Sequence, residues 1–186
     1  MKNILMLDDD LIPLSRGMTA ERSQLQPWLR WLKTGENGQK FNLIEAIDLT
    51  EMLRVMAERE FFQENDPKYI HGIIIDVMWK KTSYGKIDFS EIGFPDVPII
   101  PNEAGAQLLK LLFGNNSQSS LPSALVAHKN RKMSVLSSIR GVEINLNGLP
   151  EALTILNKNT IEKLDANAGD PVMIPDMRFQ NWIYSL

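Results

Sequence analysis

The stretch Ile73-Ile74-Ile75-Asp76-Val77-Met78 decides the fold that this sequence predicts. Three β-branched apolar residues run directly into one carboxylate. A short run this apolar is typical of a strand buried on both faces, as in a parallel sheet. Asp76 would then stand at the carboxyl end of that strand, which is the edge of an open α/β sheet where ligands bind.

The start of the chain has the same pattern. The run Ile4-Leu5-Met6-Leu7 predicts a first strand, and Asp8, Asp9 and Asp10 follow it at once. If the two strands are neighbours, Asp8, Asp9 and Asp76 meet at one edge of the sheet. Three anions this close are hard to keep ionised without a cation, and Mg²⁺ with oxygen ligands resolves the conflict. The alternative is that these acids only cap helix starts, which is the favoured interpretation for Asp10.

Strand-like and helix-like segments alternate along the chain. This alternation predicts an α/β protein with a doubly wound, five-stranded parallel sheet. The expected strands are 4–7, 41–46, 72–75, 122–128 and 142–146, and the expected helices are 19–33, one from 48, one from 103, 133–139 and 150–156. Residues 1–160 would form one domain with a long loop at 79–102, and 161–186 a C-terminal extension with an apolar anchor.

Composition narrows the functional classes. The chain has 186 residues, 44% of them hydrophobic, and a formal net charge of -3, so nothing draws it generally toward nucleic acid. It has no cysteine, which excludes disulfides and thiolate chemistry and fits a cytoplasmic location. The first apolar run is too short for a signal peptide, and no segment is long enough to span a membrane.

Three segments together resemble the receiver domain of two-component response regulators. Residues 4–10 resemble its first strand and acidic pair, residues 72–78 resemble its phosphoacceptor strand, and residues 102–109 resemble the opening of its third helix. The resemblance covers about residues 3–156. It implies a flavodoxin-like fold with strand order 2-1-3-4-5 and a signalling domain that accepts a phosphoryl group, rather than an enzyme.

The resemblance also assigns roles within the site. It implies that Asp76 accepts the phosphoryl group, that Asp8 and Asp9 organise Mg²⁺ together with Asp76, and that the backbone carbonyl of Met78 is a further metal ligand. It implies a sensor histidine kinase or a phosphotransfer protein as the phosphoryl donor. A protein partner would carry the output, with no membrane and no direct nucleic-acid binding.

Two features depart from the receiver pattern. The family carries Ser or Thr at the end of the fourth strand, where Val126 or Ala127 falls in this alignment. It also carries Lys after the fifth strand, and residues 146–150 contain none. Lys129 is a possible substitute contact to phosphate. These departures leave open a pseudo-receiver that acts as a protein-interaction adaptor without phosphorylation.

A third interpretation uses the first acids differently. The Asp8-x-Asp10 pattern after an apolar strand resembles the opening motif of haloacid-dehalogenase-type phosphatases. Asp8 would then be the nucleophile and Asp10 the general acid/base. Such enzymes also need a later pair of acids, and Asp76 has no second acid beside it.

Overall fold

The architecture is taken from a computed structural model, which describes residues 1–11, 26–77, 79, 89–94, 96–100, 103–113, 122–128, 132–137, 153–158, 160–164 and 171–186. The elements follow one another in this order: β1 (Lys2–Leu7), η1 (Asp9–Leu11), α2 (Gln26–Lys33), α3 (Gly35–Lys40), β2 (Phe41–Ala46), α4 (Leu49–Glu58), β3 (Ile70–Asp76), η3 (Phe89–Ile92), α5 (Ala104–Phe113), α6 (Ser123–His128), β4 (Lys132–Ser137), β5 (Thr154–Asn157), β6 (Thr160–Leu164), β7 (Pro171–Pro175) and α7 (Met177–Tyr184).

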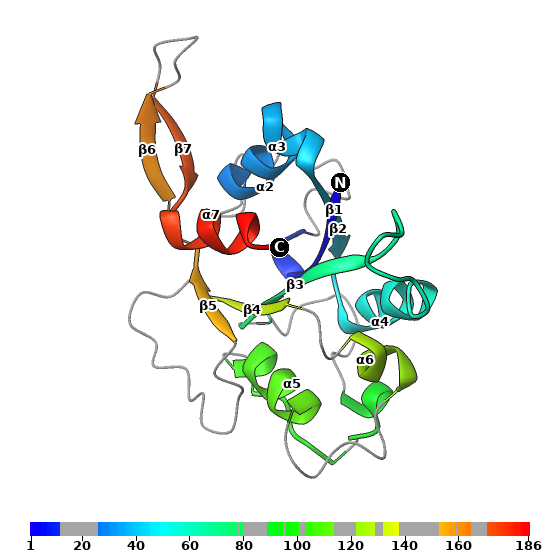
Figure 1. Cartoon of the computed structure of the whole chain (residues 1–186). Helices are drawn as coiled ribbons and strands as arrows, with labels where there is room; N and C mark the ends of the chain where they lie inside the picture. Colours follow the sequence, from blue (N-terminus) through cyan, green and yellow to red (C-terminus); the bar gives the residue numbers. More distant parts are fainter. Residues whose placement is uncertain are drawn as a thin grey trace.

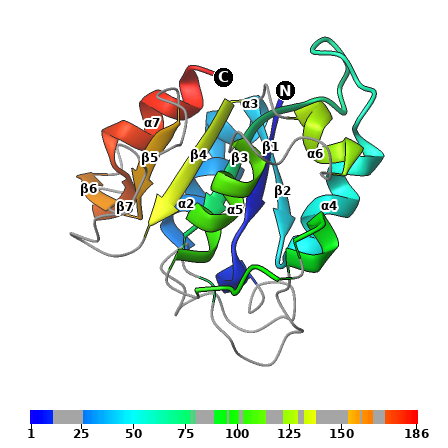
Figure 2. The ribbon, with the colours of Figure 1, turned by 90° about the horizontal axis from the view of Figure 1, so that it is seen from below.

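The first five strands form one sheet in the order β2-β1-β3-β4-β5. All four pairings between neighbouring strands are parallel. In the register, Leu7 of β1 lies opposite Ala46 of β2 and Ile75 of β3. Parallel pairing brings the carboxyl ends of the strands to the same edge, as the arrows of β1, β2 and β4 show (Figure 2).

Helices cover both faces of the sheet (Figure 1). Side chains alternate along a strand, so Leu5 and Leu7 face one core while Ile4 and Met6 face the other. The first core is closed by α4, α5 and α6, and the second by α2 and α7. Burial on both faces explains why β1 and β3 are almost uninterrupted apolar runs.

The sequence predicted the α/β class and the parallel pairing of the first three strands, and both are confirmed. β2 has the predicted bounds, and β3 ends at Asp76 as expected. The helices expected from 48 and from 103 are α4 and α5. All these elements belong to the first 113 residues of the chain.

The predictions for the second half of the sheet were largely wrong. The strand expected at 122–128 is replaced by helix α6 (Ser123–His128), in which Ala124 and His128 are buried one helical turn apart while Val126 is exposed. Residues 132–137 form strand β4, where a helix was expected. Residues 154–157 form β5, although the sequence predicted a helix over 150–156. The strand expected at 142–146 lies outside the described residues.

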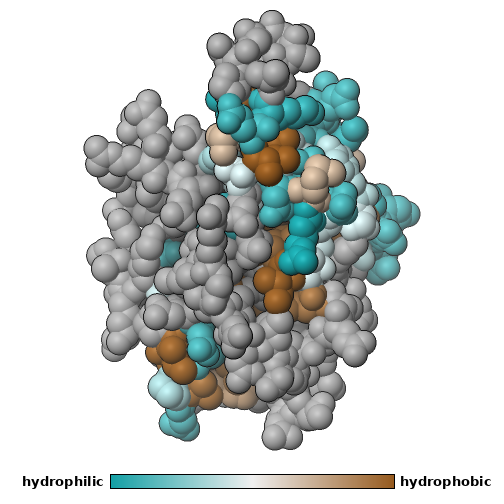
Figure 3. Space-filling view, turned by 90° about the vertical axis from the view of Figure 1, so that its left-hand side faces the viewer, coloured by the Kyte–Doolittle hydropathy of each residue, from teal (hydrophilic) through white to brown (hydrophobic). Residues whose placement is uncertain are grey.

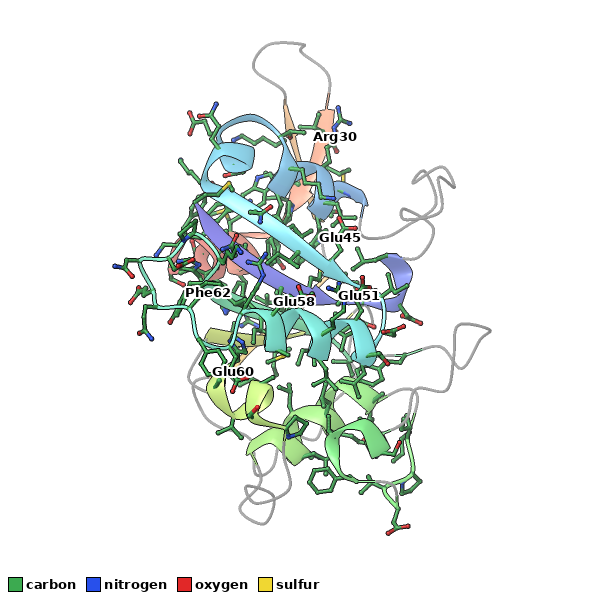
Figure 4. All side chains as sticks on the ribbon, turned by 90° about the vertical axis from the view of Figure 1, so that its right-hand side faces the viewer. Arg30, Glu45, Glu51, Glu58, Glu60 and Phe62 are labelled. Carbon is green, nitrogen blue, oxygen red and sulfur yellow. The ribbon has the colours of Figure 1, made fainter. Side chains whose placement is uncertain are left out.

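The N-terminus of α4 is fixed beside the carboxyl edge of the sheet. The Asp48 side chain accepts the Glu51 backbone N–H at 2.8 Å, and the Glu51 carboxylate accepts the Ile47 N–H at 3.0 Å. This reciprocal capping sets where the helix begins. Figure 4 shows Glu51 at this first turn, Glu58 at the far end of α4, and Glu45 on the neighbouring β2.

The C-terminal segment adds a hairpin and a helix to this core. Strands β6 and β7 pair antiparallel, and α7 then buries Phe179, Trp182 and Ile183 against the second face of the sheet. Seen from the hairpin side, apolar side chains of the described residues lie in separate patches among polar ones (Figure 3). No described helix has the length and apolar character that crossing a bilayer requires.

Candidate functional site

Asp8 and Asp76 stand side by side at the carboxyl ends of β1 and β3. Leu7 and Ile75 are the last register partners before them, and the Asp8 N–H still donates to the Ala46 carbonyl at 3.1 Å. Asp9 opens the short helix η1, which turns the chain so that Leu11 is fully buried. The local sequence therefore fixes both acids through the buried residues on either side of them.

The structure brings together the three acids named from the sequence. One carboxylate oxygen each from Asp8, Asp9 and Asp76 lies within 4.8 Å of the others. Asp8 and Asp76 are buried, with exposed fractions of 0% and 2%, whereas Asp9 is half-buried. Such a set of convergent oxygens, open on the Asp9 side, fits a hard divalent cation that keeps some of its waters.

A lysine that the sequence analysis missed completes the cluster. The Lys158 Nζ lies 2.8 Å from Asp8 Oδ2 and 2.9 Å from Asp76 Oδ1, and only 3% of this side chain is exposed. Lys158 directly follows β5, so its long side chain reaches past the end of β4 to the two central strands. The buried ammonium bridges two carboxylates that would otherwise repel each other.

The charges in the cluster do not balance. Burial, and next the charge of Asp8, raise the pKa of Asp76 to about 8, against the opposing effect of Lys158. For Lys158, burial alone would lower the pKa, but the charges of Asp8 and Asp76 outweigh it and raise the pKa above its usual value. One permanent cation among three acids thus leaves the site short of positive charge.

The main chain of Asp76 is held from two further sides. The Trp79 indole Nε1–H donates to the Asp76 carbonyl at 2.9 Å, in a fully buried hydrogen bond. Helix α5 begins directly against the next carbonyl along the chain, since the Gly105 N–H donates to the Val77 carbonyl at 3.1 Å. A shallow pocket beside the acids is lined by Leu7, Asp9, Ile47, Asp48, Leu49 and Trp79.

The remaining residues named from the sequence fall elsewhere. Met78, Lys129 and the side chain of Asp10 lie outside the described residues. Val126 and Ala127 belong to α6, so the prediction that one of them ends the fourth strand was wrong. That position is held by Ser137, the last residue of β4, which lies opposite Asn157 of β5.

The expected fifth strand was misplaced in the same way. The lysine was expected at 146–150 because the fifth strand was expected at 142–146. Instead, β5 ends at Asn157 and Lys158 comes next. The sequence held one usable signal, which is the short apolar pair Ile155-Leu156 followed closely by a lysine. Because β5 is only four residues long, its pattern of apolar residues cannot distinguish a strand from a helix.

Comparison with known proteins adds no relative to this picture: no family model matches the sequence, and no curated protein and no solved structure matches it either.

Proposed function

We propose that this chain is a divergent receiver domain of phosphorelay signalling, with Asp76 as a Mg²⁺-dependent phosphoacceptor. The observation that carries the proposal is the double ion pair of Lys158 with Asp8 and Asp76. The receiver resemblance calls for a lysine after the fifth strand, next to the phosphoacceptor. Lys158 occupies that place in sequence order and in space.

The strand order supports the same proposal. Order β2-β1-β3-β4-β5 with helices on both faces is the arrangement of a flavodoxin-like, doubly wound sheet. In such a sheet the strand order reverses between β1 and β3, and ligands bind at this switch point. Asp8 and Asp76 follow those two strands, so the acid cluster lies at the position that this topology favours.

The donor set fits Mg²⁺. Asp8, Asp9 and Asp76 would hold the ion, and the resemblance adds the backbone carbonyl of Met78. Three carboxylates are hard oxygen ligands, and the raised pKa of Asp76 reflects the shortage of positive charge that a divalent ion would relieve. When bound, the ion would neutralise the charge on the phosphoryl oxygens during transfer.

The chemistry of the chain itself is a nucleophilic displacement. An Asp76 carboxylate oxygen attacks the phosphorus of a phosphodonor, the new O–P bond forms, and the bond from phosphorus to the donor breaks. The carboxylate must be ionised for this attack, and Lys158 stabilises the ionised form. After transfer, the same ammonium lies where it can pair with the phosphoryl oxygens.

We propose a working receiver over a pseudo-receiver. That alternative was based on the apparent lack of a lysine and of a hydroxyl at the expected strand ends. Lys158 and Ser137 now follow or end the fifth and fourth strands. We propose a histidine kinase or a phosphotransfer protein as donor, a protein partner for output, and the cytoplasm as the compartment, which the lack of cysteine fits.

Beryllofluoride, a mimic of the phosphoryl group, tests this function. We expect it to raise the melting temperature of the wild-type protein when Mg²⁺ is present, because it binds the ionised Asp76 and the ion together. The Asp76→Asn variant should lose this response. Asp96→Asn, which changes an exposed acid outside the cluster, is the matched control and should keep it. A wild-type protein that does not respond to beryllofluoride and Mg²⁺ would be evidence against phosphotransfer.

The raised pKa of Asp76 predicts proton release on metal binding. Below about pH 8 the carboxyl is largely protonated, so the ion must displace a proton in order to bind. The Mg²⁺ affinity should therefore rise with pH, by up to about tenfold per unit, and level off above pH 8. Calorimetry at pH 7 in buffers of different ionisation enthalpy measures the released proton. Binding heats that do not depend on the buffer would show that Asp76 is already ionised.

A further inference from the structure

We infer that Trp79 is a positioning residue for the metal site, because its indole holds the main chain of Asp76, one of the acids of that site. The inference rests on the proposed Mg²⁺ site and adds a residue to which the receiver resemblance gives no role. Trp79 is three residues beyond the phosphoacceptor, and its side chain folds back onto that residue's main chain.

The hydrogen bond links the Trp79 side chain to the main chain three residues earlier. The indole Nε1–H donates to the Asp76 carbonyl at 2.9 Å, so the side chain of residue 79 restrains the main chain of residue 76. Only 2% of Asp76 and 4% of Trp79 are exposed, so water competes little for this bond. The bond restrains the main chain that carries the Asp76 carboxylate, which is one of the three acids of the proposed metal site.

Packing holds the indole in place. Trp79 belongs to the core cluster of the α4–α5 face, and its ring lies 6.1 Å from that of Phe89, measured between centroids. The same side chain lines the pocket beside Asp9. The indole thus packs in the core, lines the pocket beside the acid cluster and restrains the Asp76 peptide.

Preorganisation is the expected benefit. A metal ligand whose main chain is already held in place loses little conformational freedom when a metal binds. Without the indole hydrogen bond, part of that ordering would accompany binding and would weaken it. A tryptophan that served the core alone would affect folding stability but not the affinity of the folded protein for the ion.

Trp182 offers a matched control for this distinction. It is also 4% exposed, but it packs in the core on the opposite face of the sheet. Its indole nitrogen has no hydrogen-bond partner among the residues that the structure describes. Replacing either tryptophan by phenylalanine removes an indole N–H and some bulk, yet only the change at Trp79 removes the bond to Asp76.

The experiment compares the wild-type protein with Trp79→Phe and Trp182→Phe. Calorimetry gives each Mg²⁺ dissociation constant, and thermal unfolding without Mg²⁺ gives each stability. We expect Trp79→Phe to weaken Mg²⁺ binding by about 3- to 10-fold, the range that loss of one hydrogen bond gives. Trp182→Phe should stay within about twofold of the wild type, whatever its melting temperature.

Fluorescence provides a second readout. Mg²⁺ should change the tryptophan emission of the wild type and of Trp182→Phe, because Trp79 lies beside the acids, and it should not change that of Trp79→Phe. If Trp79→Phe does not fold, β-(3-benzothienyl)alanine at position 79 replaces the N–H by sulfur in a ring of the same shape, with the same expected loss. Equal affinities in the wild type and the altered protein would overturn the inference alone, whereas a wild type that binds no Mg²⁺ would overturn the proposed function with it.

Discussion

Replacing Lys158 by methionine should destabilise the metal-free protein by about 3–5 kcal/mol at pH 8, the usual cost of removing one partner from a buried ion pair. Methionine keeps most of the apolar stem and removes only the charge. The loss leaves Asp8 and Asp76 buried beside each other without the ammonium that now lies 2.8 Å and 2.9 Å from their oxygens. Denaturant unfolding of the wild type and of Lys158→Met measures the difference.

The pH dependence has a definite sign. The pKa of Asp76 is raised in the folded protein, so ionising this carboxyl costs folding free energy, and stability falls as pH rises from about 4 to about 8. Without Lys158 the carboxyl is harder still to ionise. The defect of Lys158→Met should therefore grow above about pH 8, where the carboxyl ionises in the wild type but stays protonated in the variant, and it should shrink when Mg²⁺ supplies the missing charge.

Lys163→Met is the control for this change. Lys163 is exposed on strand β6, only five residues further along the chain, and its loss should change stability by no more than about 0.5 kcal/mol. An equally small effect in Lys158→Met, unchanged by pH, would mean that the ion pairs with Asp8 and Asp76 contribute little. The buried cluster would then need another source of positive charge.

The sequence predicted the acids of the site because they follow strands whose apolar pattern is clear from the residues alone. β1 and β3 are buried on both faces, so their apolar runs are unbroken and their carboxyl ends can be recognised from the residues alone. Asp8 and Asp76 stand directly at those ends. Their proximity needed only one further assumption, which was that the two strands are neighbours in the sheet.

Lys158 had no comparable signal. Its role depends on which segment forms β5, and that strand is only four residues long. The pattern of β4 is no clearer, since Lys132 and Ser137 stand at its ends and Ser134 interrupts its apolar residues. A strand was predicted at 122–128, because Ala124, Leu125 and Val126 form an apolar run that is compatible with a buried strand. In the structure this segment is helix α6, which buries His128 against α4. Nε2 of the His128 ring lies 2.9 Å from the Met56 carbonyl oxygen.

A glycine at the start of α5 controls how closely this helix approaches the site. A Cβ atom built on Gly105 would lie 2.0 Å from the Asp76 carbonyl oxygen and 2.9 Å from the carbonyl carbon. Both obstacles are backbone atoms of the central strand, which cannot rotate away. The glycine therefore permits the Gly105 N–H to donate to Val77 and lets α5 pack directly on the phosphoacceptor strand.

Gly105→Ala should consequently destabilise the protein by about 3 kcal/mol or more, although alanine is the better helix former by about 1 kcal/mol. To relieve the contact, α5 must move by roughly 1 Å, since carbon and oxygen atoms rarely approach below about 3 Å. That movement breaks the restraint on the turn after Asp76, so the folded fraction should also bind Mg²⁺ more weakly. Urea unfolding and calorimetry measure the two effects separately.

Gly72→Ala is the matched comparison, because it adds the same methyl group to the same strand β3 at the end away from the acids. Its Cβ would meet side-chain atoms of Leu186 at 2.8 Å and of Trp182 at 2.9 Å, and a leucine terminus can rotate where a backbone carbonyl cannot. The expected cost is about 1–2 kcal/mol, with Mg²⁺ binding unchanged. A Gly105→Ala protein as stable as the wild type would mean that α5 does not rest on the Asp76 peptide.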